Sequence, residues 1–154
     1  MNDKNSRLPI FLRGTVVVGN GRGSKDLGIP TANIDDESIS KLPPMRDGVY
    51  VCVASVQGYD GIFPSATSIG TNPHYKGKKR TVEAHILHDF DPPMFHGKII
   101  SIAFIQYIRE MESFDSDNDL ISSIKSDIDI AQRLIDSKII NNMRMNAWFI
   151  SNLT

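Results

Sequence analysis

The residues best suited to chemistry lie in one glycine-rich segment, Gly19 to Asn33. The segment is GNGRGSKDLGIPTAN, with four glycines and the basic side chains Arg22 and Lys25. Glycine lets the backbone adopt positive φ and approach a ligand closely, so that N–H groups can point at phosphate oxygens. The basic side chains would add charge-assisted donors. The segment therefore predicts a phosphate-binding loop, with a solvated basic turn as the alternative.

The loop differs from the familiar nucleotide motifs, because both the P-loop and the dinucleotide fingerprint open a helix. Pro30 and the β-branched residues beside it disfavour a helix here. On an extended segment, Thr31 and Asn33 share one face. A hydroxyl and an amide oxygen beside bound phosphate suit Mg²⁺, which needs few protein ligands. The alternative is that both are ordinary turn residues.

Glu83 is the candidate general base. It is the only carboxylate at the centre of a predicted strand. A base there could accept the proton of a hydroxyl that attacks a γ-phosphate. The alternative is a structural glutamate paired across the sheet with Lys78, Lys79 or Arg80. His85 and His88 lie nearby in the sequence, but two histidines on one strand are too few to define a metal site.

The composition is that of an ordinary globular chain, and it predicts a single domain over residues 1–154. Of the 154 residues, 40% are hydrophobic and 23% charged. The 17 basic and 18 acidic residues give a net charge of −1, which argues against nucleic acid as a partner. Cys52 is the single cysteine, so no intrachain disulfide can form, and its valine neighbours predict a buried, inert thiol.

The expected location is the cytoplasm. The first residues, MNDKNSRLP, lack the apolar region of a secretory signal. The longest nearly apolar run, Ile99 to Ile105, is far shorter than the roughly 20 residues that span a bilayer. We therefore expect no membrane partner. A monomer is expected too, because no large apolar strip remains after the core is assigned.

Alternating apolar residues predict the strands that must position these groups. A first strand, Phe11 to Val18, leads into the glycine loop. In a later strand, apolar side chains alternate with Glu83 and His85, which therefore share the opposite face. A break at Gly70 to Pro73 is expected to end the strand before it. After the first strand, the strands are therefore expected at 49–54, 63–69, 81–88 and 98–108.

In the C-terminal third of the chain, the spacing of the apolar residues changes from that of strands to that of a helix. Apolar residues recur at helical spacing over 117–136, which predicts an amphipathic helix with Ser116 or Asp117 as its N-cap. The tail beyond it is polar until Ala147–Ile150, which we expect to return to the sheet as a short edge element. Strands do not alternate with helices. The predicted fold class is therefore mainly β, an antiparallel barrel with a helix packed beside it.

Three longer motifs carry a family resemblance. They are GRGSKDLGIPTAN at 21–33, SIGTNPHYKGKKRTVEAHILHDF at 68–90 and an arginine followed by Phe-Asp-Ser over 109–116. From about Leu8 to Leu134 the chain resembles the riboflavin kinase family in its stand-alone form. The resemblance implies a six-stranded Greek-key barrel with a C-terminal helix. It also implies transfer of the γ-phosphoryl group of ATP to the ribityl 5′-hydroxyl of riboflavin, giving FMN and ADP.

The same resemblance implies roles for individual positions. Glu83 matches the catalytic base. The metal would be Mg²⁺, with replacement by Zn²⁺ left open. The loop 19–33 and the segment 109–119 would be flaps that close over the substrates. The matched binding positions are Gly19 and Lys25 for the ATP phosphates, Thr31 and Asn33 for the metal, Ile86 and His88 for the nucleotide, and Arg109 and Phe114 for the flavin.

The chain departs from the family pattern at two candidate binding positions. His96 stands where the family has a tyrosine, which bears on contacts to adenine. Glu112 stands where the family commonly has a basic residue, and a carboxylate there would lose a favourable flavin contact. No nucleotidyl-transferase domain precedes the barrel, so FAD synthesis is not expected.

Two rival functions remain open at this stage. The first is a barrel that binds flavin or nucleotide without turnover, motivated by His96 and Glu112. Thr31, Asn33 and Glu83 together favour the enzyme, because a pure binder needs neither a metal pair nor a base. The second rival is an oligonucleotide-binding barrel, which would need a basic groove with exposed aromatics. The net charge of −1 argues against it.

Overall fold

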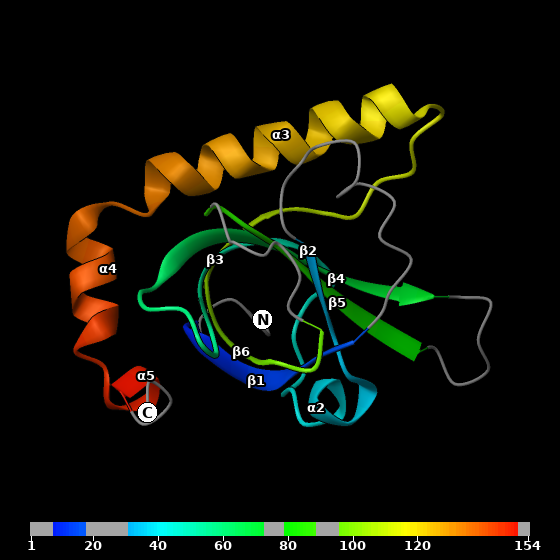
Figure 1. The fold of residues 1–154 in the computed structure, drawn as a ribbon. Coiled ribbons are helices and arrows are strands. Elements are labelled where there is room, and N and C mark those ends of the chain that lie inside the picture. The colour runs from blue at the N-terminus through cyan, green and yellow to red at the C-terminus, as the bar shows by residue number, and fades with distance from the viewer. Residues whose placement is uncertain (1–7, 18–30, 73–78, 89–95, 151–154) are drawn as a thin grey trace, which may run out of the picture.

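The strands of this protein close into an antiparallel barrel (Figure 1). The computed structural model describes residues 8–17, 31–72, 79–88 and 96–150. Around the barrel the strands follow the order β1-β2-β5-β4-β3-β6, so β2 lies beside β5 and not beside β3. This order confirms the expected mainly β fold with Greek-key connections. The strands are β1 Ile10–Val17, β2 Thr31–Ile34, β3 Gly48–Val56, β4 Phe63–Asn72, β5 Lys79–Ile86 and β6 Ile99–Arg109.

Successive side chains of β5 face the barrel interior and the outer face in turn. Val82, Ala84 and Ile86 are buried in the interior core. Glu83 and His85 point the other way and line a pocket on the outside of the barrel. Both predicted faces are therefore confirmed, because side chains of a strand alternate with a period of two.

Strand β3 is buried along its whole length, which shows that both of its faces are covered. On the outer face, Val51 and Val53 pack in one cluster with Ala131 of helix α3, Asp117–Leu134. This helix lies across the outside of the barrel (Figure 1). It confirms the helix predicted over 117–136. Of the two expected N-caps, Ser116 is the one used, and its hydroxyl accepts from the backbone N–H of Asp119 at 3.1 Å.

Strand β4 is longer than predicted. The expected stop at Gly70 is wrong, because β4 stays paired with β5 through Gly70, Thr71 and Asn72. A glycine does not end a strand when its neighbour continues to supply partners for the backbone N–H and C=O groups. The proline at position 73 lies outside the described residues.

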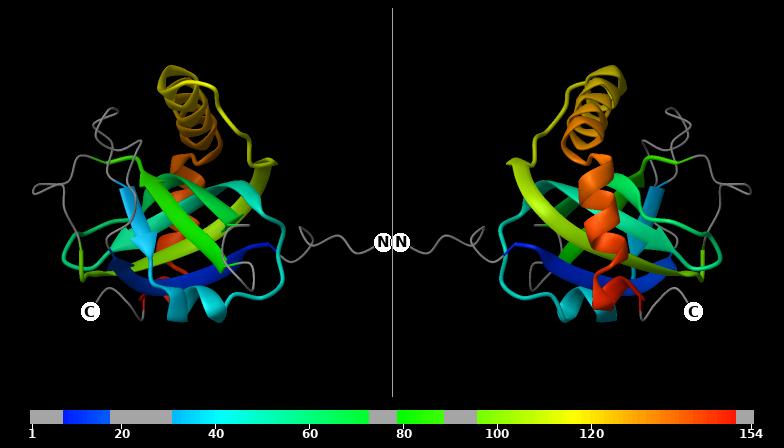
Figure 2. Two further views of the ribbon diagram at one scale, coloured as in Figure 1. Left: turned by 90° about the vertical axis from the view of Figure 1, so that its right-hand side faces the viewer. Right: turned by 90° about the vertical axis from the view of Figure 1, so that its left-hand side faces the viewer.

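The tail is helical, so the expected edge element is wrong. Helix α4, Ser137–Arg144, begins at Asp136, whose carboxylate accepts from the N–H of Ile139 at 2.9 Å. The short helix α5, Ala147–Ile150, follows it. Figure 2 shows α4 running along the barrel from the end of α3 to α5. Phe149 is fully buried in the cluster on the outer face, which ties the tail to the barrel.

A further short helix, α2, Asp36–Ser40, lies in the connection between β2 and β3. Its N-cap is Asp35, whose side chain also accepts from the N–H of Thr15 at 2.8 Å and so joins α2 to β1. In the part of the chain that is described, no helix is both long and apolar enough to cross a bilayer.

The structure confirms the prediction that the thiol of Cys52 is buried. Cys52 is completely buried in β3, and burial raises the pKa of its thiol to about 12. Because the thiolate is the reactive species, the side chain is chemically inert in the folded protein at neutral pH.

Candidate active site

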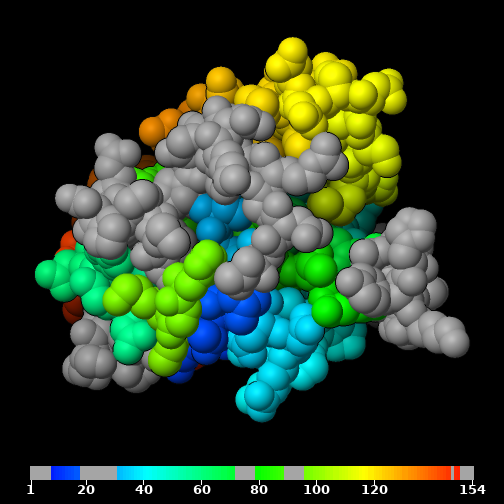
Figure 3. Space-filling view, turned by 45° about the vertical axis from the view of Figure 1, so that its right-hand side comes forward, coloured from blue at the N-terminus to red at the C-terminus, as the bar shows by residue number. Residues whose placement is uncertain are grey.

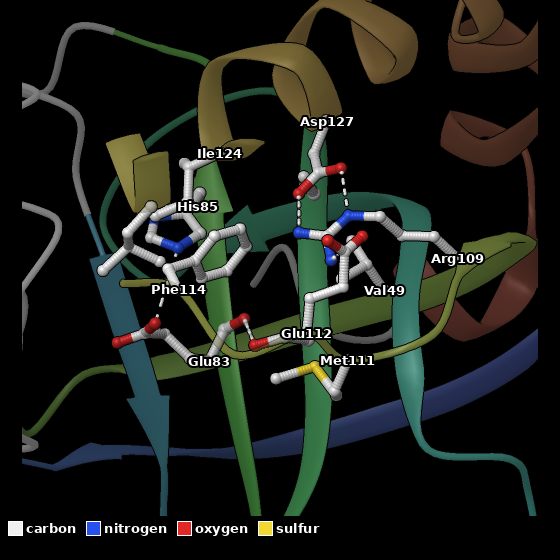
Figure 4. Close-up of a pocket in the computed structure, with 12 residues that line it drawn as sticks. Val49, Glu83, His85, Arg109, Met111, Glu112, Phe114, Ile124 and Asp127 are labelled. Atoms are coloured by element: carbon white, nitrogen blue, oxygen red, sulfur yellow. Dashed lines mark hydrogen bonds and ion pairs between the residues drawn. The ribbon is translucent and has the colours of Figure 1, made fainter. Parts of the chain in front are cut away.

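A pocket lies between the outer face of the barrel and helix α3 (Figure 4). Strands β3 to β6 form its floor, the segment 110–116 forms one side, and α3 covers it. In the view of Figure 3, β5 (green) comes to the surface between α3 (yellow) and the region of β2 and α2 (cyan). The lining residues are Val49, Ala66, Ser68, Glu83, His85, Arg109, Met111, Glu112, Phe114, Leu120, Ile124 and Asp127.

Strand register brings β2 directly against the polar residues of β5. Thr31 is opposite His85, and Asn33 is opposite Glu83. Ala32 and Ala84, which lie between them, face the interior. Thr31 and Asn33, at the end of the glycine-rich segment, therefore stand beside Glu83 and His85 at the edge of the pocket.

Glu83 keeps a partly accessible carboxylate, with 29% of its side chain exposed. Its Oε1 lies 3.4 Å from Nε2 of His85. The described basic residues that could have neutralised it pair elsewhere, Lys79 with Asp36 at 3.0 Å and Arg80 with Asp47 at 3.7 Å. Within the described ranges, these two basic residues are therefore not partners of Glu83, which argues against a purely structural ion pair at this position.

Thr31 and Asn33 offer neutral oxygen donors on one outer face, as the sequence predicts. Both side chains are half-buried. The Thr31 hydroxyl lies 3.1 Å from Nδ1 of His85. Among the described residues, no cluster of three His, Cys, Asp or Glu side chains could hold a metal alone. A cation here would therefore depend on neutral donors, water and ligand oxygens, which is the coordination that Mg²⁺ accepts.

Arg109, at the end of β6, is held by a buried carboxylate. Its Nε and Nη2 donate to the two oxygens of Asp127 at 2.8 and 2.7 Å. Nη1 donates to the carbonyl of Glu110 at 3.1 Å. The hydrogen bonds to Asp127 raise the pKa of Arg109 further above its already high value. The guanidinium is therefore fixed at the pocket wall, between the barrel and α3.

Glu112 lines the pocket with a carboxylate that lies beside Arg109. Its carboxylate lies 3.6 Å from Nη1 of Arg109 and is 56% exposed. The negative charge therefore has both a cationic neighbour and solvent. Close to it, Met111 and Phe114 give the same side of the pocket an apolar surface.

Other predicted binding positions lie outside this pocket. The Ile86 side chain is fully buried in the barrel interior, so only its backbone could meet a ligand. His88 is exposed and stacks on Phe63, with ring centroids 3.9 Å apart. His96 is exposed in a turn before β6. Gly19 and Lys25 lie outside the described residues.

Asp127 is a pocket residue that the sequence reasoning missed. It is 4% exposed and lies on the buried face of α3 with Ile124, Ile128 and Ala131. A single carboxylate within an apolar helical stripe is the signal that could have identified it, because a buried charge requires a partner.

Comparison with known proteins extends this description. The family model described as Flavokinase, riboflavin kinase, matches residues 6–135. Riboflavin kinase of Mus musculus is 45% identical over 130 residues, which are 84% of this chain and 83% of that protein. The crystal structure of riboflavin kinase from Trypanosoma brucei superposes with a TM-score of 0.69 at 33% identity, covering 97% of this chain and 94% of that one.

A longer protein contains a similar barrel. A crystal structure described as a macrolide-efflux protein from Streptococcus pneumoniae superposes with a TM-score of 0.68 at 28% identity. The match covers 80% of this chain but 38% of that one. A fold that matches 80% of this chain is thus also found as part of a larger one.

Proposed function

The chain belongs to the riboflavin kinase family and phosphorylates riboflavin with ATP, and within this reaction we propose that Glu83 is the catalytic base. One observation carries the proposal. Glu83 lines the pocket under α3 and is paired in register with Asn33, the last residue of the glycine-rich segment. A carboxylate in this position can accept a proton from a hydroxyl group bound in the pocket.

The role of Glu83 is to direct one proton. The 5′-hydroxyl oxygen of riboflavin attacks the γ-phosphorus of ATP, and its proton passes to the Glu83 carboxylate. A new O–P bond forms while the bond between the γ-phosphorus and the β–γ bridging oxygen breaks, so the products are FMN and ADP. Phosphoryl transfer depends mainly on positioning and charge stabilisation. A partly exposed carboxylate whose described basic neighbours, Lys79 and Arg80, pair elsewhere is suited to that task.

Thr31 and Asn33 would hold the divalent cation. Their neutral oxygens on one face of β2 fit Mg²⁺ in the company of phosphate oxygens and water. When bound, the ion would offset negative charge on the ATP phosphates. We take Mg²⁺ as the working assignment and Zn²⁺ as the alternative.

The flavin ring would occupy the pocket between the barrel and α3. Val49, Ala66 and Ile124 provide apolar surface, and Phe114 provides an aromatic face at the side. Arg109 would present its guanidinium at the pocket wall, and Glu112 would lie at the rim. Aromatic and apolar walls with few polar groups are typical of sites that bind planar ligands.

The nucleotide would lie on the other side of Glu83, toward the loop that precedes β2. We keep Gly19 and Lys25 as phosphate contacts, and Ile86, His88 and His96 as contacts to the rest of the nucleotide. At Ile86 the contact would have to come from the backbone. We also propose that residues 1–154 act as one domain, as a monomer in the cytoplasm, without a nucleic-acid partner.

The assignment of Glu83 is tested with Glu83→Gln. Purified wild type and variant are incubated with riboflavin, ATP and Mg²⁺, and the flavins are separated by chromatography. The expected result is a loss of turnover of about 100-fold or more, with riboflavin and ATP binding retained. Glu37→Gln, at an exposed position on α2, should retain wild-type turnover. Undiminished turnover in Glu83→Gln would overturn the assigned base.

A further inference from the structure

His85 is a buried polar side chain that lies between two proposed functional groups. Its side chain is 7% exposed. Figure 4 shows the imidazole beside Phe114 and Ile124, with one ring nitrogen directed to Glu83. The other nitrogen, Nδ1, lies 3.1 Å from the hydroxyl oxygen of Thr31 on the neighbouring strand. Both ring nitrogens therefore have a partner, as a buried imidazole requires.

The chemistry of these partners selects one tautomer. An ionised carboxylate can only accept, so a hydrogen bond across the 3.4 Å between Nε2 of His85 and Glu83 requires the proton on Nε2. Nδ1 of the neutral ring is then an acceptor. The hydrogen bond made by one ring nitrogen decides whether the other nitrogen donates or accepts. The Thr31 hydroxyl can rotate to donate its proton to Nδ1. The order of donation is then Thr31 to His85 and His85 to Glu83.

We propose that His85, as the Nε2–H tautomer, is a positioning residue that couples the carboxylate of Glu83 to the hydroxyl of Thr31. The inference rests on the proposed roles of those two residues. Through this link, one oxygen of Glu83 is held by His85 and the second accepts the substrate proton. With the Thr31 O–H bond directed toward His85, the lone pairs of that oxygen would be left available to hold a cation.

The coupling explains why an imidazole occupies this place. Thr31 and His85 are 54 positions apart and meet only because β2 pairs with β5. A hydrophobic side chain under α3 would fill the same space but would leave Thr31 and Glu83 free to rotate. Partners that orient metal ligands typically change affinity or activity by about 10- to 100-fold when removed.

The first test is spectroscopic and needs no ligand. Histidine labelled with ¹⁵N reports which ring nitrogen carries the proton, and loss of one signal set in His85→Phe assigns it among the four histidines. The expected pattern is a single neutral Nε2–H tautomer. Thr31→Val should shift the Nδ1 resonance, and Glu83→Gln the Nε2 resonance. A tautomer mixture, an Nδ1–H form, a doubly protonated ring, or resonances that neither substitution moves would overturn the proposal.

The second test is kinetic. His85→Asn keeps an amide near the position of Nδ1 but is too short to reach Glu83. It should lower kcat by about 10- to 100-fold while KM for riboflavin changes little. His85→Gln, whose amide can reach Glu83, should recover part of the loss. If kcat of both variants equals that of the wild type, the proposed coupling is wrong.

A matched control separates coupling from folding. Thr67→Val removes a buried hydroxyl on β4 whose hydrogen bond, 3.1 Å to Ser65, lies inside the barrel. It should lower Tm without changing kcat. If the His85 variants lower Tm alone, as this control does, then His85 is structural and the proposal is overturned.

The tests also distinguish this inference from the proposed function. A fixed Nε2–H tautomer together with full activity of Glu83→Gln would remove Glu83 as base but leave the coupling intact. An inactive Glu83→Gln together with a tautomer mixture at His85 would leave the base in place and remove the coupling.

Discussion

Asp127 holds the guanidinium of Arg109 through two parallel hydrogen bonds of 2.8 and 2.7 Å. The pair joins the middle of α3 to the last residue of β6, 18 positions earlier in the chain. Asp127 is buried, while the Arg109 side chain is 22% exposed and lines the pocket. The two residues together fix the wall against which a flavin would rest.

Breaking this pair should cost stability. Asp127→Asn leaves the guanidinium with a neutral partner, and we expect the free energy of unfolding to fall by about 2 kcal/mol, with a rise in KM for riboflavin. Urea denaturation and steady-state kinetics measure the two effects. Asp129→Asn is the control, because its ion pair with Arg133 is exposed and should contribute less than about 1 kcal/mol. Equal losses in both variants would contradict the special role of Asp127.

Glu112 allows a test of flavin affinity at the rim. Removing its charge with Glu112→Gln should lower KM for riboflavin, because an amide can donate to flavin carbonyl groups that repel a carboxylate. Stability should change by less than about 1 kcal/mol, since the Glu112 side chain is 56% exposed and solvent screens its pair with Arg109. Glu110→Gln, whose carboxylate pairs with Arg46, serves as control and should leave KM unchanged. A higher KM in Glu112→Gln would mean that the carboxylate itself binds riboflavin.

Asn33 allows a test of the cation site. Asn33→Ala removes one of the two neutral donors, so we expect the Mg²⁺ concentration for half-maximal turnover to rise by about 10-fold or more. Titrating Mg²⁺ at saturating ATP measures the change. Asn118→Ala, exposed in the first turn of α3, should behave as the wild type. An unchanged Mg²⁺ requirement in Asn33→Ala would remove this residue from the proposed ligand set.

Asp35 predicts a pH-dependent contribution to stability. Burial alone would raise the pKa of this carboxyl, but hydrogen bonds from Ser38 and Thr15 outweigh burial and lower it. A carboxyl whose pKa is lower in the folded state stabilises the fold above its unfolded pKa of about 4, and this stabilisation is lost as the pH falls through the folded pKa.

Replacing this N-cap shows the effect directly. Asp35→Ala should lose about 1 kcal/mol at pH 7, and the difference from wild type should narrow below a pH of about 4. Unfolding curves at several pH values measure both quantities. Glu37→Ala, exposed on the same short helix, should show a smaller difference. A loss for Asp35→Ala that is constant across this range would contradict the assigned sign.

Cys52 should report on unfolding. Burial raises the pKa of its thiol to about 12, so a thiol-specific reagent at pH 8 should label it only in denaturant. Labelling in native buffer should be slower by several orders of magnitude, because the reagent cannot reach the buried thiol and the thiol is not ionised. Rapid labelling of the native protein would show that β3 opens easily.

Local sequence patterns determined much of this protein. The period of two in 81–88 predicted that Glu83 and His85 share the outer face, and the change to helical spacing predicted α3 and its cap. Both are properties of neighbouring residues, so they can be recognised without knowing the partners of a strand or helix. The glycine-rich segment predicted phosphate and metal chemistry from residue types alone, and this stays a prediction.

Only the tertiary structure decided which distant residues meet. The pairing of β2 with β5 brings Thr31 to His85, and the docking of α3 brings Asp127 to Arg109. Phe149 has its place in the core because α4 turns along the barrel, although the tail before it is polar. Such contacts depend on how strands close the barrel and on which face of a helix packs against it. These are collective outcomes of burying apolar surface, and no short stretch of the chain encodes them.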